Sequence, residues 1–179
     1  MDRAVRGAAR GASRRATARR VLAVLVAGLA VACAPKKRLE LPSSSDLQGI
    51  YGSAASVELN GNVVVVRVEQ SAHQLQRGGQ LWAKVGPYIY LFSPQTRDLF
   101  QKWDGVAGVR VTTVDHRSRL VARATLLRDA LTSETWKTAI VRVAHARNEG
   151  TDKPGYLDQL VEYGEDHTKH EYGSHYVSP

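Results

Sequence analysis

The run of residues 63–68 constrains the fold of this chain more than any other segment. It reads Val63-Val64-Val65-Val66-Arg67-Val68, so five of its six side chains are β-branched. Such side chains favour extended backbone, and a continuous apolar run of this length predicts a central strand buried on both faces of a sheet. The Asn60-Gly61 pair just before it is typical of a type I′ turn, which indicates a hairpin with the stretch that begins at Val57.

The next segments predict more strands and a crossover helix. Residues 81–93 are apolar and aromatic, with a bend expected at Gly86-Pro87, and residues 109–114 and 120–127 are also rich in β-prone residues. A helix is expected between residues 81–93 and 109–114. Ser93 provides its N-cap and Pro94 its first helical residue. A strand, a helix and a strand at this spacing predict a right-handed crossover between parallel strands.

Two amphipathic helices are expected after the sheet. Five apolar residues of the first fall on one helical face: Trp136, Ala139, Ile140, Val143 and Ala144. The second begins near Pro154, and its apolar face holds Leu157, Leu160 and Val161. The expected fold class is therefore α+β: a small mixed β-sheet with one crossover helix and a C-terminal helical hairpin lying on the sheet.

The net charge of +8 is unevenly placed along the 179 residues. Residues 1–32 hold seven arginines and one aspartate, which is +6, whereas residues 33–179 carry only +2. A nucleic-acid-binding domain needs a basic face on its folded body. The nearly neutral body therefore argues against a nucleic-acid partner.

An uncharged run of twelve residues, 21–32, follows these arginines and ends at Cys33, the single cysteine. A transmembrane helix needs about 20 residues, so the run is too short to span a bilayer. A basic segment followed by a short apolar segment is typical of a secretory signal peptide. The alternatives are a short buried helix of the domain and a buried structural cysteine.

The residues Leu29-Ala30-Val31-Ala32-Cys33 resemble the lipobox of bacterial lipoprotein precursors. That family favours leucine three residues before the cysteine, and here Ala30 stands in that place. The resemblance implies lipidation of Cys33 and attachment to a membrane through that lipid. It further implies a cell-envelope location facing the periplasm or the exterior. Ala34, next to the cysteine, implies the outer membrane where the organism has one.

The expected organisation has four parts. Residues 1–32 are a lipoprotein-type signal peptide, and 33–56 are the lipid anchor and a flexible tether that is rich in small and polar residues. Residues 57–172 form the α+β domain, and 173–179 form a C-terminal tail.

A group of histidines and carboxylates near the C-terminus is a candidate metal site. His167, His170 and Glu171 could share a divalent ion such as Zn²⁺ or Ni²⁺, because imidazole and carboxylate at one-turn spacing on a helix reach the same side. A solvated tail or helix face explains the same residues and is the favoured interpretation, because structural metal sites usually show tighter and more complete ligand sets. We therefore expect no firmly bound cofactor.

The sequence contains no catalytic signature, so we do not expect an enzyme. A nucleophile elbow and a phosphate-binding glycine loop are both absent. Tyr88, Tyr90 and Phe92 alternate and would share one face of a strand, as core or as an aromatic platform. Arg110, Arg119 and Arg123 are expected on an exposed sheet face.

Two functions are consistent with these features. The first is an envelope lipoprotein whose non-catalytic binding or assembly domain holds an envelope protein or cell-wall component at the membrane surface. The alternative is a lipoprotein that binds a small ligand or metal through its His-rich C-terminal segment. The first should expose an apolar patch of several hundred Å², and the second should have a concave pocket with convergent polar groups.

Overall fold

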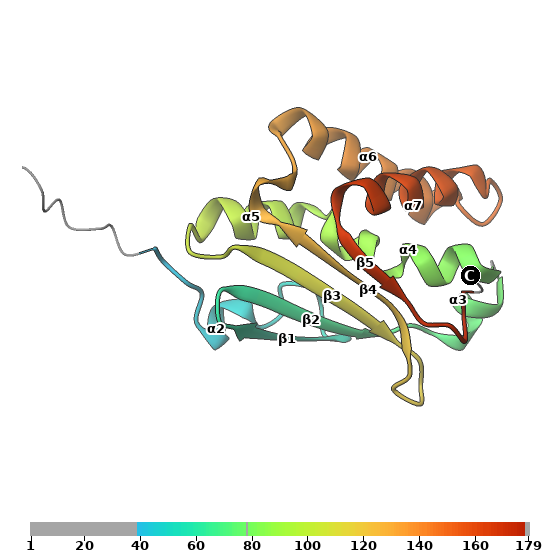
Figure 1. Cartoon of the computed structure of the whole chain (residues 1–179), viewed down its shortest axis with the longest axis horizontal. Coiled ribbons are helices and arrows are strands. Elements are labelled where there is room, and N and C mark those ends of the chain that lie inside the picture. The colour runs from blue at the N-terminus through green and yellow to red at the C-terminus, as the bar shows by residue number, and fades with distance from the viewer. Residues whose placement is uncertain (1–38, 78, 178–179) are drawn as a thin grey trace, which may run out of the picture. The chain divides into compact units, whose positions relative to one another are not determined.

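The valine-rich run forms the second strand of a five-stranded mixed sheet (Figure 1). The computed structural model describes residues 39–77 and 79–177. In it, β2 (Val63–Glu69) pairs antiparallel with β1 (Ala55–Asn60) and parallel with β3 (Gly108–Val114). The sheet continues antiparallel through β4 (Leu120–Leu127) and β5 (Lys169–Tyr172), so that the strand order follows the chain. The expected α+β class with a small mixed sheet is confirmed.

The turn between β1 and β2 lies one residue later than predicted. Asn60 pairs with Val63, so Gly61 and Asn62 are the two central residues. Gly61 has a φ of +63°, which glycine adopts without a steric penalty. A glycine of positive φ in the first central position is typical of a type II′ turn.

Burial of β2 alternates, in contrast to the expected burial on both faces. Val64, Val66 and Val68 are buried, whereas Val63 and Val65 are half-buried and Arg67 is exposed. The reason is that helices cover one face of the sheet and leave the other open (Figure 1). Arg110 and Arg123 are exposed on this open face, as the alternation predicted.

The predicted strand over 81–93 is wrong, because this segment is the central helix of the fold. Three helices connect β2 to β3: α3 (Ala72–Arg77), α4 (Gly79–Leu91) and α5 (Pro94–Lys102). Helix α4 is buried on most sides, from Trp82 to Leu91, and a short apolar run of this kind has no periodicity that distinguishes a helix from a strand. The crossover between parallel strands does exist, but it starts from β2.

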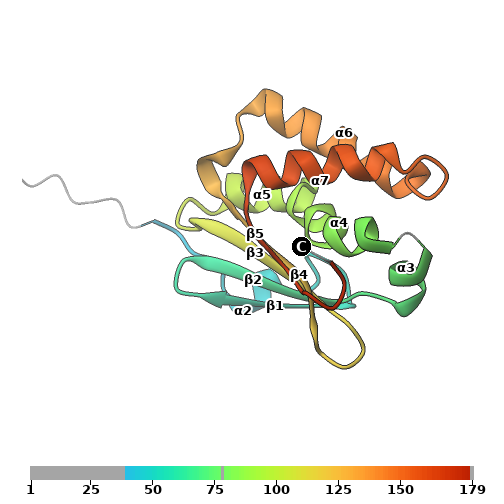
Figure 2. The same ribbon diagram turned by 45° about the vertical axis from the view of Figure 1, so that its right-hand side comes forward.

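The C-terminal helical hairpin is confirmed, with a difference in placement. Helix α6 (Ser133–Glu149) has Thr132 as its N-cap, and α7 (Gly155–His167) packs against it. Figures 1 and 2 show both helices on the side of α4 that faces away from the sheet, and α4 contacts β3, β4 and α7. The hairpin therefore forms a third layer over α4. Within residues 39–77 and 79–177, no helix has the length and apolar character needed to cross a membrane.

The predicted boundary between tether and domain is too late in the sequence. Helix α2 (Ser44–Leu47) begins at a capping box of Ser43 and Asp46, and Leu47 is fully buried in the main core. The backbone carbonyl of Glu40 also accepts a 2.8 Å hydrogen bond from the N–H of Gly105. Residues 40–56 therefore belong to the domain, and the part of the predicted tether before residue 39 lies outside the described residues.

The predicted C-terminal tail is also largely part of the domain. The N–H of Gly173 donates a 2.9 Å hydrogen bond to the carbonyl of Val121, and Val177 is buried against Ala83 and Val121. Residues 173–177 therefore continue from β5 beside β4 and pack against α3 and α4.

Candidate functional site

The three residues predicted as metal ligands do not converge. His167 ends α7 and its Nδ1 lies 2.8 Å from the carbonyl oxygen of Tyr163. His170 and Glu171 are consecutive in β5, so their side chains leave opposite faces of the sheet, and Glu171 forms a 3.0 Å ion pair with Arg123. The described residues include no group of three potential ligands placed to hold a metal ion. Cys33, the predicted lipidation site, lies outside the described residues.

A cavity of about 170 Å³ lies at the carboxyl ends of the two parallel strands, β2 and β3. This is the edge at which open sheets with parallel strands bind their ligands. The lining combines the ends of both strands with residues of α3, α4 and α6: Val68, Glu69, Gln70, Gln74, Trp82, Gly86, Ile89, Tyr90, Thr113 and Arg147.

Gln70, the first residue after β2, is the central polar group of this cavity. Its side chain is 6% exposed, and its backbone N–H donates a 2.8 Å hydrogen bond to the carbonyl of Val114. Its Nε2 donates a 2.6 Å bond to the carbonyl of Trp82, which fixes the amide orientation because a carbonyl oxygen can only accept. The amide oxygen, Oε1, is left buried without a hydrogen-bond partner.

Gly86 allows α4 to approach this amide closely. A Cβ at position 86 would lie 2.8 Å from Oε1 of Gln70 and 3.1 Å from Cγ2 of Thr113. The glycine in the middle of α4 is therefore explained by close packing of the helix against the ends of the strands. The sequence had instead suggested that this glycine marks a bend in a strand.

A second buried group of the cavity also lacks a partner. Trp82 is 8% exposed, and its indole Nε1, which can only donate, makes no hydrogen bond among the described residues. Two charged residues of the lining, Glu69 and Arg147, are exposed. Neither side chain forms an ion pair or hydrogen bond within the part of the chain that the structure describes. The residues around the cavity thus include one buried unpaired acceptor, one buried unpaired donor and the exposed Arg147, whereas strand alternation places the Glu69 side chain on the open face of the sheet with Arg67.

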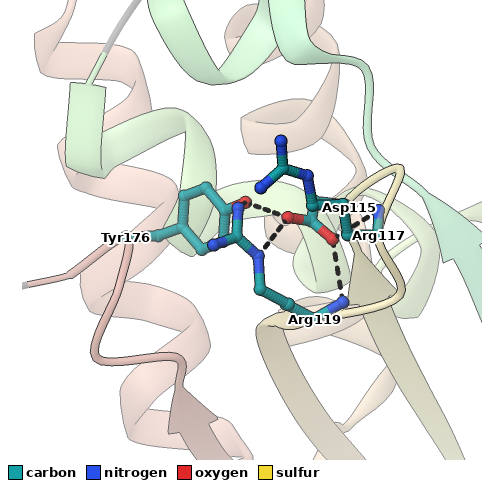
Figure 3. Close-up of polar contacts among 4 residues, drawn as sticks. All are labelled: Asp115, Arg117, Arg119 and Tyr176. Carbon is teal, nitrogen blue, oxygen red and sulfur yellow. Dashed lines mark hydrogen bonds and ion pairs between the residues drawn. The ribbon is translucent and has the colours of Figure 1, made fainter.

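Asp115, the residue after β3, forms a separate polar cluster nearby (Figure 3). Its Oδ1 accepts hydrogen bonds from the backbone N–H groups of Arg117 and Arg119, at 2.9 and 2.8 Å. Its Oδ2 accepts from Nε of Arg119 at 2.7 Å and from the Tyr176 hydroxyl at 2.5 Å. Burial raises the pKa of the carboxyl, but these four bonds outweigh burial and hold the pKa well below its usual range.

A second hollow, of about 250 Å³, borders this cluster and includes His116 and His175. Helix α3 contributes residues to both hollows, Gln74 to the first and Leu75 to the second. In the second hollow the buried carboxylate already has four donors. We therefore take the cluster around Asp115 as structural and the cavity at Gln70 as the candidate site.

The aromatic residues that the sequence placed on one strand face have separate roles in and directly after α4. Tyr88 and Phe92 are one helical turn apart, fully buried and stacked with ring centroids 6.0 Å apart. Tyr90 is half-buried, lines the cavity and contacts the Tyr51 ring edge-on. One of the three is therefore in the candidate site, and the other two belong to the core.

Sequence reasoning missed the residues that matter most in the cavity: Gln70, Trp82 and Arg147. One signal was available, because Gln70 is a polar residue directly after a buried strand, the position from which parallel strands present ligand-binding groups. Arg147 carried no such signal, since its place near the cavity depends on how α6 packs over α4.

No protein-family model matches the chain, and comparisons with curated proteins and with solved structures found no significant similarity.

Proposed function

We propose that the chain is an envelope lipoprotein whose folded domain is a non-catalytic module that binds a small polar ligand. The observation that carries this proposal is the cavity at Gln70, whose lining residues include two buried polar atoms without partners. Each unpaired buried atom costs about 1–3 kcal/mol of stability in the free protein. A ligand that supplies the missing partners would recover part of that free energy.

The start of the described domain and the cavity lie at opposite ends of the sheet. The chain enters the described domain at Leu39, and Glu40 binds Gly105, just before the start of β3. The cavity lies at the other end of β3, beside Thr113. Cys33 is six residues before Leu39 in the chain, so a lipid there would be attached on the side of the entry segment and not through the residues of the cavity.

The exposed apolar residues favour a ligand over a large protein partner. Within residues 39–77 and 79–177, the exposed large hydrophobic residues are Leu39, Leu41, Leu127 and Val141. Val141 lies on α6, whereas Leu39 and Leu41 lie before α2, where the chain enters the described domain. An interface with a stable protein partner needs a contiguous apolar patch, whereas a ligand site needs a concave pocket with a few polar groups.

The open face of the sheet supports a second candidate, the assembly module. Arg67, Arg110 and Lys169 are exposed there, and half-buried Val63 and Val65 lie among them. Glu58, Glu69 and Glu171 are exposed on the same face, so it presents charges of both signs around a partly apolar centre, which suits an envelope protein with a complementary charge pattern.

The test is an intact-mass measurement of the protein extracted from membranes in mild detergent under non-denaturing conditions. The proposal expects a chain that starts at Cys33 with a diacylglyceryl increment, together with a small non-covalent mass. Ile89→Trp, which fills the cavity from its half-buried wall, should remove the small mass, and Val141→Trp on the outer surface of α6 should retain it.

Three results would decide against parts of this proposal. A full-length chain that starts at Met1 without lipid would overturn the anchor. A small mass that survives Ile89→Trp would overturn the cavity as its site. A protein-sized added mass that Arg110→Glu removes would favour the assembly module.

A further inference from the structure

We propose that the free edge of β1 is a docking site for an extended segment of a partner protein in which basic and apolar residues alternate. Such a segment would add a sixth strand to the sheet through backbone hydrogen bonds. The proposal depends neither on the ligand of the cavity at Gln70 nor on the lipid anchor. It follows from the different character of the two sheet edges, from the unpaired backbone groups of β1 and from the charge beside them.

The two edges of the sheet are built differently. The strand order places β1 at one edge and β5 at the other (Figure 1). β5 has only four residues, and three of them are charged or polar: Lys169, His170 and Glu171. β1 has six residues, contains no proline and carries a single charge, on Glu58. Short length and charged side chains keep an edge strand from pairing, so the β5 edge is protected and the β1 edge is not.

The backbone groups on the outer side of β1 have no partners. Asn60 and Val63 flank a two-residue turn, so this pair exchanges both of its hydrogen bonds, and the bonds to β2 recur at every second residue. The N–H and C=O groups of Val57 and Leu59 therefore point away from β2. Helix α2 contacts β1, but no group in the described part of the chain makes a hydrogen bond to these four outward groups. Two donors and two acceptors are thus available to an added strand.

Glu58 sets the charge that the added strand should carry opposite it. Val57 and Leu59 would be hydrogen-bonded positions of the new ladder, so Glu58 between them takes a non-hydrogen-bonded position, where opposite side chains are closest. Its carboxylate is exposed on the open face and forms no ion pair or hydrogen bond with any described residue, and its neighbour across β2 is Val65. An opposite charge in such a pair is stabilising and a like charge is destabilising. A basic residue is therefore expected opposite Glu58.

The other face of the added strand would meet apolar side chains. Ala55, Val57 and Leu59 lie on the helix-covered face of β1 and pack against the main core, yet all three remain only half-buried. An apolar side chain beside them on a sixth strand would remove more of this surface from water. Because successive side chains of a strand point to opposite faces, the partner segment should alternate basic residues with apolar ones.

A second copy of this chain fits the β1 edge less well. In an antiparallel pair of β1 strands centred on Glu58, two carboxylates would lie directly opposite each other, which is destabilising. A pair centred on Val57 or Leu59 would place Glu58 opposite Ser56 or Asn60 of the second copy, and neither residue carries a positive charge. A partner segment with basic residues supplies the counter-charge that β1 itself lacks.

The experiment measures the binding of two fluorescent peptides to the full chain in mild detergent by anisotropy. One peptide alternates lysine with valine and the other alternates glutamate with valine, and both are capped at their ends. We expect saturable binding of the lysine peptide and binding of the glutamate peptide that is at least about fivefold weaker, because only the first places a cation opposite Glu58. The bound lysine peptide should also slow hydrogen exchange at the N–H groups of Val57 and Leu59.

Matched variants test the charge. Glu58→Lys should reverse the order of the two peptides, and the exposed position makes loss of folding unexpected. Glu162→Lys makes the same chemical change at an exposed position of α7 and should leave the order unchanged.

A second pair of variants tests the backbone groups. Val57→Pro removes an outward N–H and keeps the bonds of β1 to β2, so it should weaken the lysine peptide at least about tenfold. Val57→Ala trims the same side chain but retains the N–H, and it should weaken the peptide less than Val57→Pro does. Circular dichroism checks that both variants are folded, and Glu58→Lys carries the test alone if Val57→Pro is not.

Four results would overturn the proposal. The first is that neither peptide binds the wild-type chain. The second is that the glutamate peptide binds as tightly as the lysine peptide, or that Glu58→Lys leaves their order unchanged. The third is that folded Val57→Pro binds the lysine peptide as the wild type does, which would place the peptide elsewhere on the molecule. The fourth is a concentration-dependent dimer in sedimentation that Val57→Pro abolishes and the lysine peptide does not, since the occupant of the edge would then be a second copy.

Discussion

The Tyr176 hydroxyl donates a 2.5 Å hydrogen bond to Oδ2 of Asp115, and this bond joins two segments that are 61 residues apart in the sequence. Asp115 directly follows β3, and Tyr176 belongs to the C-terminal segment that follows β5. Nε of Arg119 binds the same carboxylate oxygen, so one buried acid fixes both the β3–β4 loop and the C-terminus (Figure 3).

We expect this carboxylate to make the stability of the domain sensitive to acid. Its pKa is lowered in the folded protein, so the charged form is stabilising above the unfolded-state pKa of about 3.9. That contribution is lost as the pH falls below about 4 towards the folded-state pKa, because protons then favour the unfolded chain. In Asp115→Asn, the melting temperature should be lower at pH 7 and should fall less steeply between pH 5 and 2, as thermal melts would show.

Tyr176→Phe serves as a partial version of the same change. It removes one of the four donors and keeps the carboxylate, so its pH profile should lie between those of the wild type and Asp115→Asn. Parallel pH profiles for all three proteins would contradict this role of Asp115.

The sequence predicted the strands better than it predicted the helix between them. The β-branched residues of β2, β3 and β4 and the Ser93-Pro94 start of α5 are local signals, and the structure confirms each element. Helix α4 has no such signal, because it is buried on most sides and carries Gly86 and Pro87 within one apolar run. Its identity as a helix depends on the helices and strands that surround it.

The candidate site was less predictable, since its groups come from separate parts of the chain. Gln70 follows β2, Trp82 lies in α4 and Arg147 lies near the end of α6. Their convergence requires the crossover from β2 and the packing of the helical hairpin over α4. The sequence pointed instead to His167 and His170, which are close in the chain but belong to a helix end and a strand.

Gly164 in α7 should be intolerant of any side chain. A Cβ there would lie 2.5 Å from the ring of Tyr88, so the close crossing of α4 and α7 depends on this glycine. Gly164→Ala should lower the free energy of unfolding by about 1–3 kcal/mol, because both helices are held by other contacts and cannot separate freely. Chemical denaturation would measure the loss.

The matched control is Gly155→Ala at the start of the same helix. A Cβ at position 155 meets no atom within 4 Å. That variant should keep or raise the stability by up to about 1 kcal/mol, since alanine loses less backbone entropy than glycine. Equal effects of the two substitutions would contradict the close approach at Tyr88.

Five tyrosines with raised pKa values should ionise late in an alkaline titration, and Tyr51 and Tyr88 are among them. Burial raises the pKa of Tyr51 to about 12, although its hydroxyl lies 2.8 Å from that of Thr96, and burial likewise raises the pKa of Tyr88 to about 12. The neutral forms are favoured in the folded state, so their contribution to stability is present below pH 10 and is lost as the pH rises towards 12. Absorbance of tyrosinate near 295 nm should show a late phase that is smaller in Tyr51→Phe. An unchanged late phase would count against the burial of this hydroxyl.

Leu47 tests whether the segment before β1 belongs to the folded domain. Its side chain is fully buried in the main core, whereas Leu39, eight residues earlier, is 63% exposed. Leu47→Ala should lower the free energy of unfolding by about 2–5 kcal/mol, because it removes buried methyl groups and leaves a cavity. Leu39→Ala makes the same chemical change at an exposed position and should alter the stability by no more than about 0.5 kcal/mol. If both variants unfold at the wild-type denaturant concentration, residues 43–54 do not contribute to the core and the domain begins near β1, as the sequence alone had indicated.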